Sequence, residues 1–112
     1  MYPYKGIDQT CAFDESSATA VNVTTYTDVA AQDVEQMKAA VAKQPTSVSI
    51  EADKFVFQMY RSGIFDSAEC GTQLDHAVLV VGYGKDANTG KDYWIMKNSW
   101  DASWGEDGYM RL

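Results

Sequence analysis

The amino-acid sequence predicts an α+β fold with one main helix and an antiparallel sheet. Three observations predict this class. Apolar residues recur at helical spacing between residues 33 and 43, side chains alternate between apolar and polar after Pro45, and two strand-like runs flank a turn between residues 77 and 97. With 112 residues, of which 46% are hydrophobic and 22% charged, the chain has the composition of one globular domain.

Residues 1–23 contain turn-forming residues such as Pro3 and Gly6, and no helical or strand period lasts long enough there to predict an element. A helix is predicted over residues 33–43, because Asp33 can cap its first turn and Gln44-Pro45 ends it. The apolar residues on one face of this helix are Val34, Met37 and Val41.

Strand patterns begin after Pro45. Residues 47–52 alternate as in a half-buried strand, an alternation that puts Glu51 on the polar side. A short helical turn is predicted over residues 55–60. The remaining strands are predicted over residues 77–83, 93–97 and 109–112, and the first two form a hairpin through a turn at 85–92. The whole pattern is one helix with about five antiparallel strands.

Charge and hydropathy exclude two classes of partner. Nine basic and sixteen acidic residues give a net charge of −7, which argues against binding the phosphate backbone of a nucleic acid. No run approaches the roughly 20 apolar residues that a membrane span needs. We therefore expect neither nucleic acid nor a membrane as a partner.

The only histidine, His76, lies where a charged turn meets an apolar strand. Asn98 follows 22 positions later, and its amide can hold one nitrogen of the imidazole while the other stays free for proton transfer. The alternative for His76 is an ordinary histidine at the end of a strand, bonded to nearby carbonyls. The alternative for Asn98 is an amide that satisfies the backbone of a turn.

Three motifs carry a family resemblance: Asp-His-Ala at His76, Lys-Asn-Ser-Trp at Asn98, and Trp-Gly-Glu-x-Gly-Tyr from Trp104. Together they resemble the papain family of cysteine peptidases, in particular its cathepsin L-like members, and the resemblance spans nearly the whole chain. It implies that residues 24–112 form the barrel-like right-hand domain, incomplete at both ends, and that residues 1–23 are the tail end of the left-hand domain.

The resemblance also implies roles for individual residues. His76 and Asn98 would be catalytic, and Trp100 would shield their hydrogen bond from water. Trp104 would pack against the substrate on the leaving-group side, although an ordinary core position is equally open. The other positions that resemble substrate-binding positions of the family are Ser49, Gln58, Leu74, Asp75 and Ala77. An apolar wall made by Leu74 and Ala77 would favour a hydrophobic substrate side chain.

The function implied is hydrolysis of peptide bonds by a cysteine, histidine and asparagine, without a cofactor or metal. In the family the cysteine lies well over a hundred residues before the histidine, whereas only 75 residues precede His76. We therefore expect a chain inactive alone, whose partners are a peptide substrate, an N-terminal half with the cysteine, and cystatin-like or propeptide inhibitors. The resemblance suggests a lysosome, a vacuole or the extracellular space as location.

The two cysteines have a different expected role. The resemblance implies that Cys11 and Cys70 are disulfide cysteines whose partners lie outside these residues, so we expect free or intermolecularly paired thiols ahead of a Cys11–Cys70 bridge. Two other functions stay open. One is a binding module that has lost catalysis, and the other is a metal site built on His76, Asp75 and Cys70, for which the spacing offers no recognised ligand frame.

Overall fold

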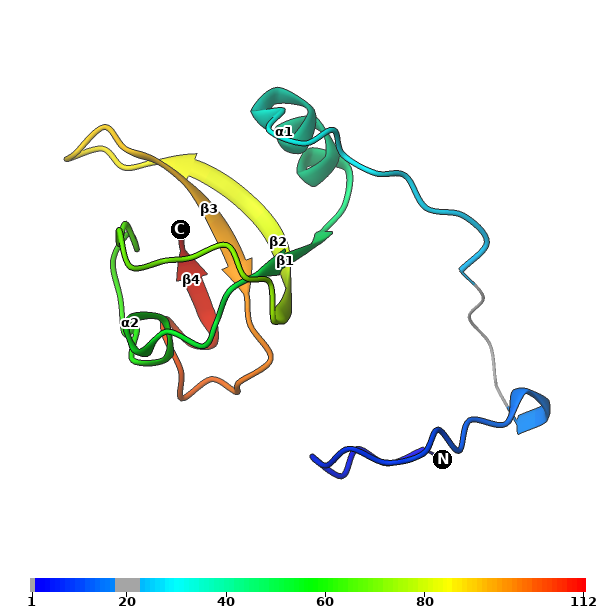
Figure 1. The fold of residues 1–112 in the computed structure, drawn as a ribbon. Helices are drawn as coiled ribbons and strands as arrows, with labels where there is room; N and C mark the ends of the chain where they lie inside the picture. The colour runs from blue at the N-terminus through cyan, green and yellow to red at the C-terminus, as the bar shows by residue number, and fades with distance from the viewer. Residues whose placement is uncertain (1, 18–22) are drawn as a thin grey trace.

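The computed structural model describes residues 2–17 and 23–112 and has the predicted α+β fold (Figure 1). Four strands form one antiparallel sheet in the order β1-β2-β3-β4, so neighbours in sequence are neighbours in space. The helices are η1 (Glu15–Ser17), α1 (Val34–Lys43) and α2 (Phe55–Gln58), and the strands are β1 (Thr46–Ile50), β2 (His76–Lys85), β3 (Asp92–Lys97) and β4 (Tyr109–Arg111).

Helix α1 begins and ends where the sequence predicts. Asp33 is its N-cap, and the carboxylate accepts a hydrogen bond of 2.8 Å from the backbone N–H of Gln36. Gln44 is extended, and its N–H donates to Ala40, which closes the last turn. The predicted apolar face is less buried than expected, because only Val41 is buried within the helix and Val34 is 54% exposed.

The β2–β3 hairpin forms as predicted, although both strands extend further into the turn. The turn is closed by Asp86, whose Oδ1 accepts hydrogen bonds from the backbone N–H groups of Asn88 and Thr89 at 3.1 and 2.7 Å. Gly90 in the turn has φ +71°, a conformation that glycine adopts without strain. The two strands are paired from Lys85 opposite Asp92 to Leu79 opposite Lys97, and the pairing register shifts between Val80 and Gly82.

The described residues contain four strands rather than about five. The segment after α2 pairs with the sheet only through an isolated bridge between Ile64 and Arg111, and a second bridge joins Glu106 to Tyr109. A second expectation is also corrected: Glu51 is buried, not exposed with the polar side of the strand. Strand β1 ends at Ile50, so the alternation stops applying at Glu51, and a later loop covers the side chain.

The core lies between the sheet, α2 and the loops around them. Met96 and Met110 are fully buried and face each other across β3 and β4. Phe57 of α2 packs against the rings of Trp100 and Trp104, at centroid distances of 5.5 and 5.2 Å. The buried residues of this cluster are Ala52, Phe57, Tyr60, Val78, Met96, Trp104 and Met110.

The N-terminal segment runs away from the sheet in Figure 1, and its residues are mostly exposed. Several large apolar side chains of this segment are exposed: Tyr2, Tyr4, Ile7, Phe13, Val23 and Tyr26. Residues 1 and 18–22, which belong to the predicted left-hand tail 1–23, lie outside the described residues. The division at residue 23 stays a prediction.

Candidate active site

His76 is the first residue of β2, and the backbone around it is fixed by β1. In the antiparallel register His76 lies opposite Ile50. The N–H of Asp75 donates to the carbonyl of Ile50 at 3.0 Å, and the Asp75 carboxylate accepts from the N–H of Ala52 at 2.7 Å. The residue before the histidine is therefore hydrogen-bonded through both its backbone and its side chain.

Asn98 directly follows β3, and its side chain meets the imidazole. Its Oδ1 lies 2.8 Å from Nε2 of His76 and also accepts the N–H of Ser99 at 2.8 Å. Because an amide oxygen can only accept, Nε2 must carry the proton, and in the neutral ring Nδ1 is then the free base. Within residues 2–17 and 23–112, Nδ1 has no hydrogen-bond partner.

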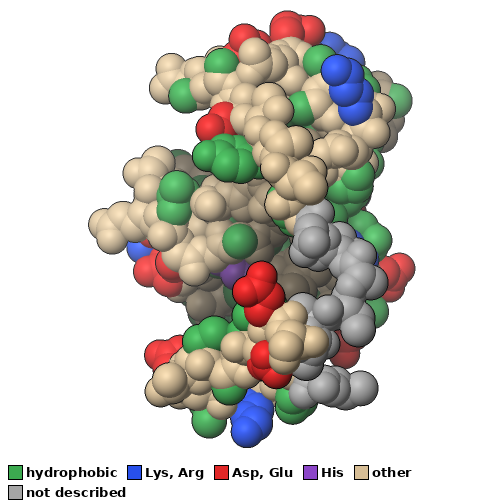
Figure 2. Space-filling model, turned by 90° about the vertical axis from the view of Figure 1, so that its right-hand side faces the viewer, with side chains coloured by type: hydrophobic (Ala, Val, Ile, Leu, Met, Phe, Trp, Pro, Cys, Tyr) green, Lys and Arg blue, Asp and Glu red, His purple; other side chains and the backbone are tan. Residues whose placement is uncertain are grey.

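Trp100 covers this pair. Its ring stacks on the imidazole with centroids 5.1 Å apart and planes inclined by 28°. Trp100 in turn packs edge-on against Phe57 and Trp104, so its position is set by the core. Asn98 is only 7% exposed. A hydrogen bond shielded from water in this way is stronger than one in solvent. The histidine remains visible in a hollowed part of the surface (purple in Figure 2).

Trp104 lies in the core and is 7% exposed. Its indole N–H donates to the carbonyl of Gln58 at 3.1 Å, which connects the loop before β4 to α2. Gly105 after it has φ +60°, and an added Cβ would come within 2.5 Å of the Tyr109 carbonyl, so turn geometry requires glycine here. The structure thus gives Trp104 a packing position, and contact with substrate stays a prediction.

The remaining predicted site residues fall into two groups. Ser49, Leu74, Asp75 and Ala77 are exposed beside His76, and Ser49 pairs directly with Ala77 across β1 and β2. Gln58 lies apart from them on α2, where its amide N–H₂ donates to the carbonyl of Asp53 at 3.2 Å. Both groups project exposed side chains.

Neither cysteine contacts the imidazole. Cys11 and Cys70 are both exposed and unbridged, and within the described part of the chain no hydrogen bond connects either thiol to His76. The same described residues hold no group of three or more His, Cys, Asp or Glu side chains arranged to bind a metal ion. Among them there is also no helix of the length and hydropathy that a membrane crossing requires.

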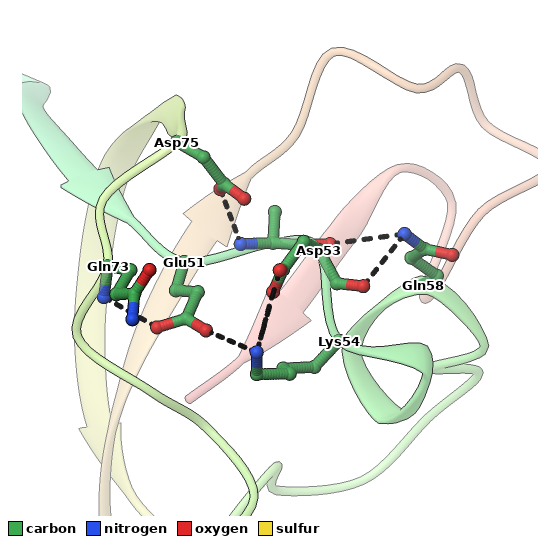
Figure 3. A network of polar contacts seen from close by, with 7 residues as sticks. Glu51, Asp53, Lys54, Gln58, Gln73 and Asp75 are labelled. Atoms are coloured by element: carbon green, nitrogen blue, oxygen red, sulfur yellow. Dashed lines mark hydrogen bonds and ion pairs between the residues drawn. The ribbon is translucent and has the colours of Figure 1, made fainter.

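A polar cluster that the sequence did not reveal lies beside the loop leading to His76 (Figure 3). At its centre is the buried carboxylate of Glu51, which pairs with Nζ of Lys54 at 2.7 Å and accepts the N–H of Gln73 at 2.5 Å. The hydrogen bond from Lys54 is the main cause of a lowered Glu51 pKa, and that from Gln73 is the second. The only signal in the sequence is an acidic residue three positions before a lysine.

A second ion pair holds the loop that carries Trp104. Arg111 forms two hydrogen bonds to Glu106, the Nε bond being 2.9 Å, and Glu106 also accepts the N–H of Gly63. The hydrogen bond from Arg111 lowers the pKa of Glu106.

A cavity of about 520 Å³ lies elsewhere, between α1 and the strands β2 and β3, and is lined in part by Lys38, Tyr83 and Trp94. None of its lining residues belongs to the predicted site.

The contacts of His76 with Asn98 and Trp100 are those that the family resemblance implies for a cysteine protease domain. The sequence profile described as "Papain family cysteine protease" matches residues 1–112, so the chain belongs to the papain family, as predicted. It is 54% identical over 111 residues to "Cysteine proteinase RD21A" of Arabidopsis thaliana, covering 99% of this chain and 23% of that protein. It is 48% identical over 113 residues to "Cathepsin L" of Sarcophaga peregrina, covering 99% and 33%.

Solved structures agree with the fold. The bromelain protease from Ananas comosus, in complex with the E64 inhibitor, matches with a TM-score of 0.64 and 55% identity, over 69% of this chain and 34% of that one. The predicted α+β, papain-like fold is therefore confirmed. This chain spans about a quarter to a third of the length of these two curated relatives.

Proposed function

We propose that this chain supplies the histidine and asparagine of a papain-family cysteine peptidase, and that a segment outside these 112 residues supplies the nucleophilic cysteine. The observation that carries the proposal is the 2.8 Å contact between Nε2 of His76 and Oδ1 of Asn98 beneath Trp100. This contact leaves Nδ1 as the proton acceptor. Because Cys11 and Cys70 are exposed and, in the described residues, neither thiol is hydrogen-bonded to the imidazole, the chain is proposed to be inactive alone.

In the proposed reaction Nδ1 of His76 takes the proton of the cysteine thiol. The thiolate sulfur attacks the peptide carbonyl carbon, and the C–N bond breaks as the imidazolium returns its proton to the leaving amine. The imidazole then takes a proton from water, whose oxygen displaces the sulfur from the thioester. Asn98 holds the ring through both steps without adding a charge.

The substrate is proposed to be a peptide lying along the exposed residues beside His76. Leu74 is 65% exposed and can bury apolar surface against a hydrophobic substrate side chain, together with Ala77. Ser49 and Asp75 supply polar contacts on the same side. Gln58 and Trp104 are proposed for the leaving-group side, where the exposed Gln58 amide is the accessible group.

Location and further partners are proposed from the family. We expect a lysosomal, vacuolar or extracellular location, and cystatin-like or propeptide inhibitors as partners. A non-catalytic binding module is the other function considered. The ordered contact among His76, Asn98 and Trp100 favours catalysis, since a module without catalysis has no need for this arrangement.

The test is hydrolysis of a fluorogenic peptide by this chain, alone and mixed with an N-terminal half that carries the cysteine. We expect activity only in the mixture. His76→Ala should reduce it by about 10²- to 10⁴-fold, the usual contribution of a general acid–base. Asn98→Ala should reduce it less, because the base remains present. Glu69→Ala is the matched control, since Glu69 is exposed and outside the site. Full activity of the His76→Ala mixture would contradict the proposal.

A further inference from the structure

Two side chains stand out among the described residues because they are polar or charged and yet buried. They are Asn98, at 7% exposure, and Glu51, at 4%. Burying a polar group is costly unless its hydrogen bonds are satisfied, and burying a charge costs more. Asn98 holds the ring of His76. Glu51 has no part in the mechanism described above, so its burial requires a different explanation.

Apart from its ion pair with Lys54, Glu51 contacts the loop that enters β2. Its carboxylate accepts the N–H of Gln73, three residues before His76. Gly71 of the same loop lies so close that a Cβ added there would be 2.1 Å from Oε2 of Glu51. Gly71 has no left-handed backbone conformation, so the need for glycine comes from this close approach. The loop backbone is thus packed directly onto the carboxylate.

The hydrogen bonds on either side of Glu51 complete the attachment. Ile50 accepts the N–H of Asp75 at 3.0 Å. The carboxylate of Asp75, labelled in Figure 3, accepts the N–H of Ala52 at 2.7 Å. The three consecutive residues from Ile50 to Ala52 therefore hold the residues just before His76 at three points. Glu51 supplies the point furthest along the chain from His76, at Gln73. Among residues 50–52, Glu51 is the one whose side chain accepts a hydrogen bond from the loop between Gly71 and Leu74.

Lys54 offsets the cost of burying the Glu51 carboxylate, because it supplies the opposite charge. Its ammonium lies 2.7 Å from Oε1 of Glu51 and 3.2 Å from Asp53. This hydrogen bond is the main cause of the lowered Glu51 pKa, so the carboxylate stays charged in mildly acidic solution and continues to accept from Gln73.

We propose that Glu51 is a positioning residue for His76, which acts by fastening the loop of residues 71–75 and thereby fixing where the imidazole meets Asn98. The proposal rests on the role of His76 given under the proposed function. It predicts that disturbing Glu51 loosens the Nε2 contact with Asn98 although no atom of His76, Asn98 or Trp100 is changed.

The test is NMR of the imidazole in the 112-residue chain, which has one histidine and therefore one set of ring signals. In the wild type the Nε2–H proton, shielded by Asn98 and Trp100, should exchange slowly with water. Glu51→Ala should accelerate this exchange about tenfold or more. Glu51→Gln keeps an acceptor for Gln73 and should stay near the wild-type rate. The methyl signals of the buried Met96 and Met110 report whether each variant is folded.

Gly71→Ala provides an independent disturbance, because its methyl group displaces the Glu51 carboxylate while every polar group is retained. It should accelerate exchange like Glu51→Ala, and adding it to Glu51→Ala should have little further effect. Glu69→Ala, with the same change of charge in an exposed position, should have none.

Wild-type exchange in folded Glu51→Ala or Gly71→Ala would overturn the proposal, as would a Glu51→Gln variant as fast as Glu51→Ala. If Glu51→Ala does not fold, the exchange rate of the Nε2–H proton in Gly71→Ala tests the proposal instead. The measurement needs no hydrolysis, so its outcome is separate from that of the proposed function.

Discussion

Replacing Met110 by alanine should destabilise the core strongly, and the structure allows the cost to be worked out. Met110 is fully buried and lies opposite the equally buried Met96. The change removes three heavy atoms, which at about 0.8 kcal/mol per methylene-sized group is a loss of about 2.4 kcal/mol. The cavity left between two fixed strands adds to this, so we expect about 3 kcal/mol, within the usual range for such changes.

The assay is urea or thermal unfolding followed by tryptophan fluorescence, because Trp100 and Trp104 belong to or contact the same core. At about 2.1 cal/mol/K per residue, unfolding of 112 residues has an entropy of about 0.24 kcal/mol/K, so 3 kcal/mol lowers the Tm by about 12 °C. Met59→Ala is the matched control, since Met59 is 50% exposed and should cost well under 1 kcal/mol. Equal losses in the two variants would refute this description of the core.

Two further predictions concern charge and backbone strain. Because Arg111 lowers the pKa of Glu106, the Glu106 carboxylate binds a proton less readily in the folded chain than in the unfolded chain. The free energy of unfolding of the wild type should therefore exceed that of Glu106→Gln by its largest amount above about pH 4.3, the ordinary glutamate pKa. This difference should disappear as the pH falls through the lowered pKa that Glu106 has in the folded chain. Urea midpoints between about pH 6 and 2 measure it, and a difference that grows toward low pH would contradict the ion pair. Asp101 has φ +70°, so Asp101→Gly should relieve about 1 kcal/mol of backbone strain and raise the urea midpoint of unfolding. A lower midpoint would contradict this prediction and would show that the hydrogen bond from the N–H of Ala102 to the Asp101 carboxylate outweighs the strain.

The elements that could be predicted from sequence are those set by local pattern. The cap at Asp33 and the break at Pro45 bound α1 in sequence and in structure alike. The hairpin follows from two apolar runs around a turn at residues 85–92. The contact between His76 and Asn98 was anticipated from motifs rather than from periodicity, and the geometry agrees with it.

The features that were missed depend on contacts between distant segments. Glu51 continues the polar side of the β1 pattern, yet it is buried because residues 71–73, which come 20 to 22 positions later, fold over it. No local pattern encodes such a contact. Val34 was expected in the buried face of α1 and is exposed, since only the end of the helix near Val41 is buried.

The place of the His76–Asn98 pair in the hairpin has a consequence for how the site forms. Pairing the residues next to the turn closes the shortest loop and so costs the least entropy, which favours pairing that starts there and proceeds toward the open end of the hairpin. His76 and Asn98 lie at that open end, beyond the last paired residues Leu79 and Lys97. We therefore expect the hydrogen bond between His76 and Asn98 to form last during folding, and to break first when the strand ends fray. In hydrogen exchange the amides near the site should open at lower free energy than those beside the turn-proximal strand pairs.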